Sequence, residues 1–189
     1  MAIETPDYEV IKTEGDFEIR KYAGYVTANV TIQADGYKQA ANAGFSYLAD
    51  YIFGNNHGSG KISMTAPVNT KKLGSQKIVM TAPVNTTQQG NSYLVSFTMP
   101  SQYKMDDLPT PNNTDVSLTE VEPFWSAAVT FSGYITDKKL DLYSIKLKDW
   151  ATRNKLETIG QPVYSQFNPP WTPWFLRHNE IYFYIKSID

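Results

Sequence analysis

Side chains able to carry out catalysis are few and scattered in this chain. The 189 residues include no cysteine and two histidines, His57 and His178. The absence of cysteine excludes disulfides, thiolate metal sites and cysteine nucleophiles, and a serine nucleophile would depend on one of the two histidines as its base. GxSxG, HExxH and glycine-rich phosphate-loop motifs are missing. The neighbours Asp106 and Asp107 diverge and cannot face each other as a catalytic pair. We therefore expect no catalytic residue, and a protein that is not an enzyme.

Each histidine has two interpretations. Imidazole is a good iron ligand, and His57 lies in the glycine-rich stretch GNNHGSG, from which it could reach a bound iron. A stretch of this composition is also typical of a solvated loop, which we favour. His178, within LRHNE, could likewise be a ligand or a surface turn residue, and we favour the surface turn residue. The sequence therefore predicts no metal ligand.

A late stretch, NPPWTPWFLR from Asn168 to Arg177, is the strongest candidate for ligand contact. It holds three prolines together with Trp171, Trp174 and Phe175. Prolines reduce the entropy that a loop loses when it becomes ordered around a ligand. A loop this apolar either packs on the body of the protein or covers a groove, and the sequence leaves both alternatives open.

A strand and a helix precede the centre of the chain. Residues Val26–Ile32 alternate between apolar and polar positions, as in a half-buried strand. From Gly36 to Phe53, apolar residues recur at steps of three and four, which predicts an amphipathic helix. Asp35 is the expected N-cap of this helix, and Gly54 can end it.

A repeated motif dominates the centre of the chain. The sequence KISMTAPVNT, residues 61–70, returns as KIVMTAPVNT, residues 77–86. Both copies alternate, which predicts an antiparallel hairpin that buries Ile62, Met64, Ile78 and Met80. The prolines of the motif cannot donate to a strand ladder, so we expect them at strand ends, bulges or an edge.

The order of elements recurs in the second part of the chain. Residues 100–114 are rich in Pro, Asn and Asp and separate two halves, at about 8–100 and 115–187. The strand Ala127–Ile135 and the helix Asp137–Lys155 would correspond to the first strand and helix, with Thr136 as a cap and Val163–Phe167 and Ile181–Lys186 as closing strands. We predict an α+β fold of one domain, residues 1–189. Its pseudo-twofold strand–helix–strand–strand units would form a distorted antiparallel β-barrel with two long helices.

The composition of the chain limits the kinds of partner and the cell compartment that we expect. A net charge of −2 provides no basic surplus for nucleic acid. No apolar run approaches the ~20 residues of a membrane span. The first ten residues, MAIETPDYEV, lack a hydrophobic signal segment, so we expect a soluble protein in the cytoplasm.

Several of these motifs, in this order, resemble the SOUL/heme-binding protein family. They are MTAPV after a helix that ends in YIFG, then NPPW, and then RxNE before the last strand. The resemblance extends from about Tyr8 to Lys186. It implies a pseudo-twofold α+β fold related to small-molecule effector-binding domains, and a tetrapyrrole as the ligand.

The resemblance also implies a site, between the helix 36–53 and the loop 168–177. Basic side chains that meet the heme propionates in relatives fall here at Asn42 and Asp50, and a histidine ligand of one branch falls at Lys21, so this chain departs from both patterns. Lys38 and Arg177 could replace the missing propionate partners. The predicted binding residues are Lys38, Asn42, Phe45, Ala49, Trp171, Trp174, Phe175 and Arg177.

The leading hypothesis is therefore non-enzymatic binding of heme or a related tetrapyrrole in a hydrophobic groove, as a carrier or buffer. One alternative is a binding module for another flat amphipathic small molecule. Another is a protein-interaction domain that uses the aromatic loop.

Overall fold

The computed structural model describes residues 4–58, 76–168 and 172–188. In chain order the elements are β1 (Tyr8–Glu14), β2 (Phe17–Tyr22), β3 (Tyr25–Gln33), α1 (Tyr37–Ile52), β4 (Asn56–His57), β5 (Val84–Gln89), β6 (Ser92–Thr98), the 3₁₀ turn η1 (Met105–Asp107), β7 (Thr110–Pro111), β8 (Val116–Val121), β9 (Phe124–Phe131), α2 (Asp137–Arg153), β10 (Thr158–Gln166), the 3₁₀ turn η2 (Trp174–Leu176) and β11 (Asn179–Ile185).

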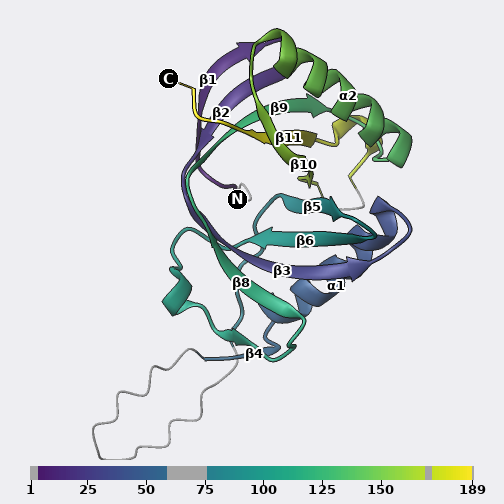
Figure 1. Cartoon of the computed structure of the whole chain (residues 1–189). Coiled ribbons are helices and arrows are strands. Elements are labelled where there is room, and N and C mark those ends of the chain that lie inside the picture. Colours follow the sequence, from purple (N-terminus) through teal and green to yellow (C-terminus); the bar gives the residue numbers. More distant parts are fainter. Residues whose placement is uncertain (1–3, 59–75, 169–171, 189) are drawn as a thin grey trace, which may run out of the picture.

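One curled antiparallel sheet organises the molecule (Figure 1). Its nine strands follow the order β1-β2-β9-β11-β10-β5-β6-β3-β8, and β4 pairs separately with β7. The units β3-α1-β5-β6 and β9-α2-β10-β11 occupy equivalent places on either side of the β10–β5 pair. The predicted α+β fold of two related strand–helix–strand–strand units is confirmed. Among the described strands, β1 and β8 form the two edges of the sheet.

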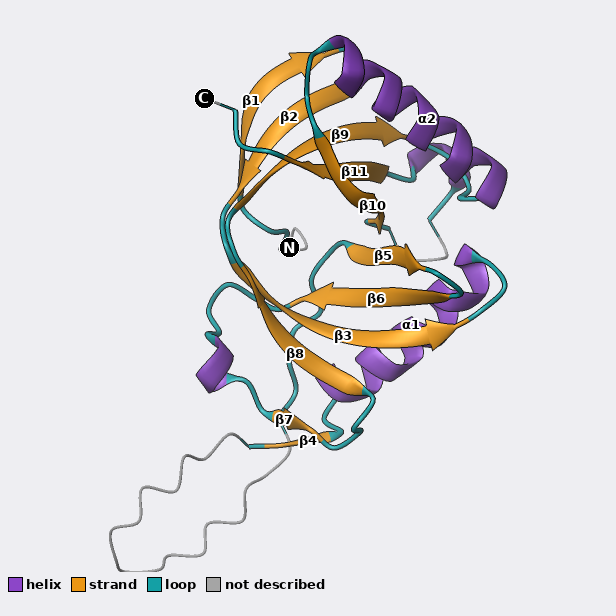
Figure 2. Ribbon diagram, in the orientation of Figure 1, coloured by secondary structure: helices purple, strands orange, loops and turns teal. Residues whose placement is uncertain are grey.

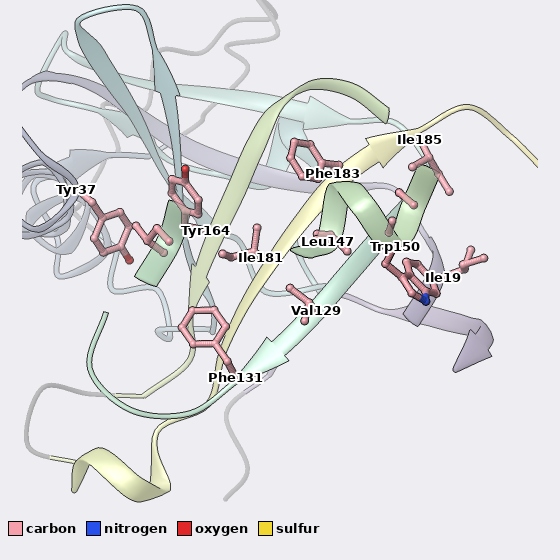
Figure 3. Close-up of a cluster of buried hydrophobic side chains, with 13 residues drawn as sticks. Ile19, Tyr37, Val129, Phe131, Leu147, Trp150, Tyr164, Ile181, Phe183 and Ile185 are labelled. Carbon is pink, nitrogen blue, oxygen red and sulfur yellow. The ribbon is translucent and has the colours of Figure 1, made fainter. Parts of the chain in front are cut away.

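Each helix covers the strands of its own half, as Figure 2 shows. Helix α1 packs on β3, β5 and β6, and α2 packs on β9, β10 and β11. Gly44 brings α1 close to the sheet, because a Cβ on this residue would lie 2.5 Å from the Cβ of Val95. The core under α2 includes Trp150 and Leu147 at one end and reaches Tyr37 of α1 at the other (Figure 3). The two cores therefore meet at the start of α1.

The predicted hairpin over the repeated motif is wrong for the second copy. Residues 77–83 have no regular secondary structure, and the strand begins only at Val84. Pro83, which follows a cis peptide bond, cannot donate to a ladder, and this explains why pairing starts after it. Burial nevertheless alternates from Ile78 to Met80, since Ile78 is buried, Val79 is exposed and Met80 is half-buried, but it stops alternating at Thr81, which is also buried. The first copy, with Ile62 and Met64, lies outside the described residues.

The helix ends differ from the prediction at one position. Thr136 caps α2 as expected, and its hydroxyl accepts from the backbone N–H of Lys139 at 3.3 Å. Asp35 does not cap α1, because the N-cap is Gly36 and makes no side-chain hydrogen bond there. Gly54 follows the last turn of α1 with a φ of 121°, a conformation that favours glycine. Within the described ranges, no helix is long and apolar enough to cross a membrane.

Candidate functional site

A cavity of about 680 Å³ lies where the two helices begin. Its lining comes from the first turns of both helices, the segment before α2, the end of β10 and the residue after η2: Tyr37, Lys38, Ala41, Asn42, Tyr134, Ile135, Thr136, Asp137, Gln166 and Arg177. This volume is in the range of ordinary small-molecule sites, about 300–1,000 Å³. Residues from both halves of the chain therefore build this one cavity.

A hydrogen bond joins the first turns of the two helices at the wall of this cavity. The carboxylate of Asp137 accepts from the backbone N–H of Tyr37, with 3.2 Å between Oδ1 and N. An added Cβ on Gly36 would lie 3.4 Å from Oδ2 of Asp137, an ordinary van der Waals distance, so the carboxylate lies directly against this N-cap. Asp137 therefore accepts a hydrogen bond from an amide at the start of α1, which is the role that the sequence predicted for Asp35.

Two cationic side chains, Lys38 and Arg177, line the cavity. Lys38 projects from the first turn of α1, and Arg177 follows η2. Arg177 is braced, because its Nε donates to the carbonyl oxygen of Thr172 at 2.9 Å and its guanidinium lies 4.6 Å from the ring centroid of Tyr134. Asp137 supplies the one negative charge among the described lining residues, so the wall carries a net positive charge suited to an anionic ligand.

The apolar part of the wall comes from Tyr37, Ala41, Tyr134 and Ile135. Tyr37 is buried, and its ring meets that of Tyr164 edge-on at 5.8 Å. Burial raises the pKa of the Tyr37 hydroxyl, so this group stays neutral at physiological pH. Tyr134 is 59% exposed and lies at the rim of the cavity. The lining thus combines flat apolar surface with cations at its edge.

The structure brings only some of the predicted binding residues together. Lys38, Asn42 and Arg177 line the cavity. Ala49 of α1 is buried, and Phe45 packs edge-on against Phe97 at 5.4 Å. Neither of these two residues reaches the cavity wall.

The aromatic loop residues are close in sequence to Arg177 but do not line the cavity. Trp174 and Phe175 form η2 with Leu176, directly before Arg177, and their side chains are 56% and 60% exposed. They present an exposed apolar surface on this loop. Trp171 lies outside the described residues.

Other lining residues were not predicted from the sequence. Tyr134, Ile135 and Asp137 belong to the segment that leads into α2, and Gln166 ends β10. The pseudo-twofold pattern was the signal that could have identified them, because it makes the start of α2 the counterpart of the start of α1.

Neither histidine belongs to this cavity. Nδ1 of His57 lies 2.7 Å from Oδ1 of Asn112, and Nε2 of His178 lies 2.9 Å from Oε1 of Glu180. Over the described ranges, no cluster of three or more His, Cys, Asp and Glu side chains could hold a metal ion. Neither imidazole is among the described residues that line the cavity.

A second cavity, of about 390 Å³, lies near the start of the chain and has the opposite charge. Its lining includes the carboxylates of Glu4, Asp7, Glu120 and Glu122, and one cation, Lys104. Such a wall repels an anionic ligand. The cavity between the helix starts is therefore the better candidate for a ligand with carboxylates.

The observed fold is an α+β domain built from two related units around one antiparallel sheet. The chain belongs to the SOUL heme-binding protein family, whose model matches residues 3–184. A relative is "Heme-binding protein 2" of Homo sapiens, which is 25% identical over 98% of this chain and 88% of its own length.

Solved structures share the fold at low identity. The C-terminal domain of EcmrR aligns with a TM-score of 0.63 at 11% identity, covering 96% of this chain and 99% of that one. A structure described as a hydrolase from Listeria innocua aligns with a TM-score of 0.57 at 7% identity, covering 93% of this chain and 94% of that one. At these identities the similarity shows the fold alone.

Proposed function

We propose that this protein binds heme or a closely related tetrapyrrole, without catalysis, in the cavity between the starts of α1 and α2. The observation that carries the proposal is the pair Lys38 and Arg177 on the wall of a cavity of about 680 Å³ with an apolar lining. Membership of a heme-binding family supports the same ligand class. We also propose that residues 1–189 act as one cytoplasmic binding domain in a carrier or buffer role.

The residues of the cavity fit the two chemical parts of such a ligand. Lys38 and Arg177 are placed to meet carboxylates through charge-assisted hydrogen bonds. Ala41, Ile135 and the ring of Tyr134 offer apolar contact to a flat macrocycle. The half-exposed Trp174 and Phe175 would extend this apolar contact beyond the cavity.

The described lining of the cavity offers few side chains that could coordinate a heme iron. A tyrosinate is a known heme ligand, and among the described lining residues Tyr134 is the accessible phenol, since Tyr37 is buried. A bound heme would supply a Lewis-acidic iron and two carboxylates. The chain supplies two cations and an apolar wall, so we infer that the ring and the propionates contribute more to affinity than the iron.

Titration of the purified protein with hemin tests this proposal. We expect a saturable Soret shift at one equivalent and quenching of tryptophan fluorescence. The double variant Lys38→Ala, Arg177→Ala should weaken binding by about tenfold or more, since each charge-assisted contact contributes up to ~1.5–3 kcal/mol. Lys148→Ala, an exposed lysine of α2 that does not line the cavity, is the control. Equal affinity in the double variant and the control would rule out this cavity.

The absence of an imidazole from the described lining favours a second candidate, a module for flat amphipathic anions in general. Iron-free protoporphyrin separates the two possibilities. If the ring and the propionates dominate, protoporphyrin and hemin will bind with similar affinity. A much higher affinity for hemin would show that an iron ligand contributes strongly.

A further inference from the structure

A row of polar side chains crosses the sheet on the face opposite the helices. Asn29 of β3 pairs with Ser96 of β6, Ser96 with Asn85 of β5, Asn85 with Ser165 of β10, and Ser165 with Glu180 of β11. All five side chains are at least nine-tenths buried. The row therefore runs through the interior of the curled sheet and joins both halves of the fold.

The orientation of this row follows from the strand period of two. A residue adjacent to each row position faces a helix, and these neighbours also pair in register: Val30, Val95, Thr86, Tyr164 and Ile181. All five are buried, and most belong to the two helix-facing clusters. Apolar side chains at the row positions would have been the simpler way to fill an interior, because burying a polar group is costly unless it finds a partner.

Part of this row faces a cavity of about 230 Å³, lined by Asn29, Asn85 and Ser96 together with Thr27. Nδ2 of Asn29 donates to the hydroxyls of Thr27 and Thr119 at 3.1 and 3.2 Å. Oδ1 of Asn85 accepts from the hydroxyl of Ser165 at 2.7 Å. Within the described part of the chain, Nδ2 of Asn85 and the hydroxyl of Ser96 have no side-chain hydrogen bond. Both groups therefore keep hydrogen-bonding capacity for a molecule in the cavity.

The cavity lining is neutral and partly aromatic. It contains no Asp, Glu, Lys, Arg or His among the described residues, and Tyr25, Tyr182 and Tyr184 form one side. Burial raises the pKa of the Tyr25 and Tyr182 hydroxyls, so both remain uncharged phenols. The nearby carboxylate of Glu180 is neutralised by Arg20, whose two terminal nitrogens contact it at 2.7 and 2.9 Å. A charged ligand would find no counter-ion here.

We propose that this cavity is a second binding site, for an uncharged polyol of monosaccharide size. Asn29, Asn85 and Ser96 supply an amide and hydroxyl pattern that matches ligand hydroxyls, and the tyrosine rings offer flat surfaces to the C–H faces of a sugar ring. Charge distinguishes this site from the cavity between the helix starts, which has cations on its wall.

The test uses the ¹⁵N-labelled full chain and NMR, with myo-inositol, D-glucose and D-galactose as probes. We expect saturable shifts of the Asn29 and Asn85 side-chain amide signals with at least one probe. Asn85→Ala and the smaller change Ser96→Ala should each weaken that binding by about tenfold, as expected for one lost buried hydrogen bond of ~1.4 kcal/mol. Thr31→Ala, an exposed position of β3 on the same face, is the control.

Two outcomes would overturn this proposal. One is that none of the three probes produces a saturable shift. The other is a shift with equal affinity in Asn85→Ala, Ser96→Ala and the control, which would place the polyol elsewhere. Hemin titration reports on the other cavity, so either proposal can fail without the other.

Discussion

Asp137, the first residue of α2, accepts a hydrogen bond from the backbone N–H of Tyr37, the first residue of α1, at 3.2 Å. One carboxylate from the second half of the chain therefore satisfies an unpaired amide at the helix start of the first half. The same carboxylate also lines the cavity that we assign to a dianionic ligand. Stability and ligand binding should consequently respond to Asp137 in opposite directions.

Two substitutions separate these effects. Asp137→Ala removes the cap and the charge, so we expect a loss of ~0.5–2 kcal/mol in the free energy of unfolding together with tighter hemin binding. Asp137→Asn also removes the charge but keeps an oxygen acceptor. It should therefore lose less stability than Asp137→Ala and bind hemin as tightly as Asp137→Ala does. Urea unfolding and hemin titration measure the two quantities, with Asp141→Ala, an exposed position of α2 away from the cavity, as the control. Equal destabilisation by Asn and Ala would contradict the capping role.

A new positive charge at Asn42 should strengthen hemin binding. Asn42 is exposed on α1 and lines the cavity one turn after Lys38. Asn42→Arg adds a propionate partner that contributes up to ~1.5–3 kcal/mol, less in a wet site. Asn42→Gln is the matched neutral control, and raising the salt concentration should reduce the difference between the two variants. An Arg variant with the affinity of the Gln variant would place the propionates elsewhere.

Removal of both histidines should leave hemin binding largely intact. His57 and His178 are each engaged outside the cavity, with Asn112 and Glu180 respectively. We therefore expect the double variant His57→Ala, His178→Ala to keep its Soret shift. Tyr134→Phe should change the ferric heme spectrum more than the double variant does, because it removes the accessible phenol. Loss of the Soret shift in the histidine variant would identify an imidazole ligand.

Periodicity was enough to predict much of the fold. The apolar steps of three and four predict a helix from Gly36 to Phe53, and α1 extends from Tyr37 to Ile52. The second helix was expected to end at Lys155 and ends at Arg153, followed by Lys155 with a φ of 60°. The repeated motif did not predict the hairpin correctly, because alternation of burial does not require a hydrogen-bonded ladder. Burial alternates from Lys77 to Met80 without a strand, and Thr81, Ala82 and Pro83 are then all buried.

The lining of the candidate cavity could be predicted only in part. Lys38, Asn42 and Arg177 are predicted from the sequence and line the cavity, whereas Tyr134 and Asp137 line it without having been predicted. Helical spacing placed Phe45 and Ala49 near the groove, but spacing does not show how far a helix extends over a sheet. Phe45 and Ala49 lie about two and three turns beyond Lys38 on α1. Phe45 packs against Phe97 of β6 and Ala49 is buried, and neither residue lines the cavity.

The second copy of the repeated motif should contribute to stability through Ile78. Its side chain is 3% exposed in the core under α1, and its backbone N–H donates to the carbonyl oxygen of Ile52 at 2.7 Å. Ile78→Ala should reduce the free energy of unfolding by ~2–5 kcal/mol. Val79→Ala, at a side chain that is 71% exposed, should change it little. Similar urea midpoints for these two variants would contradict the structural role of this segment.

The pair Arg20 and Glu180 should make stability depend on pH in the acidic range. Both side chains are buried, at 2% and 3% exposure. Burial alone would raise the pKa of Glu180, but hydrogen bonds from His178 and Arg20 outweigh it and hold the pKa below its ordinary value of 4.5. A carboxyl whose pKa is lowered by folding stabilises the protein above its unfolded-state pKa. This stabilisation is lost as the pH falls through the folded-state pKa.

We therefore expect the free energy of unfolding to decrease as the pH falls below about 4.5, and Glu180→Gln to show a flatter dependence. Arg20→Met should cost ~3–5 kcal/mol at neutral pH, because it leaves a buried carboxylate without its cation. The double variant Arg20→Met, Glu180→Leu should recover most of this loss, since an apolar pair avoids the desolvation of both charges. Urea unfolding from pH 3 to 7 provides all three comparisons. If the double variant is as unstable as Arg20→Met alone, the loss of stability comes from disturbed packing. It would then not come from an unpaired buried charge.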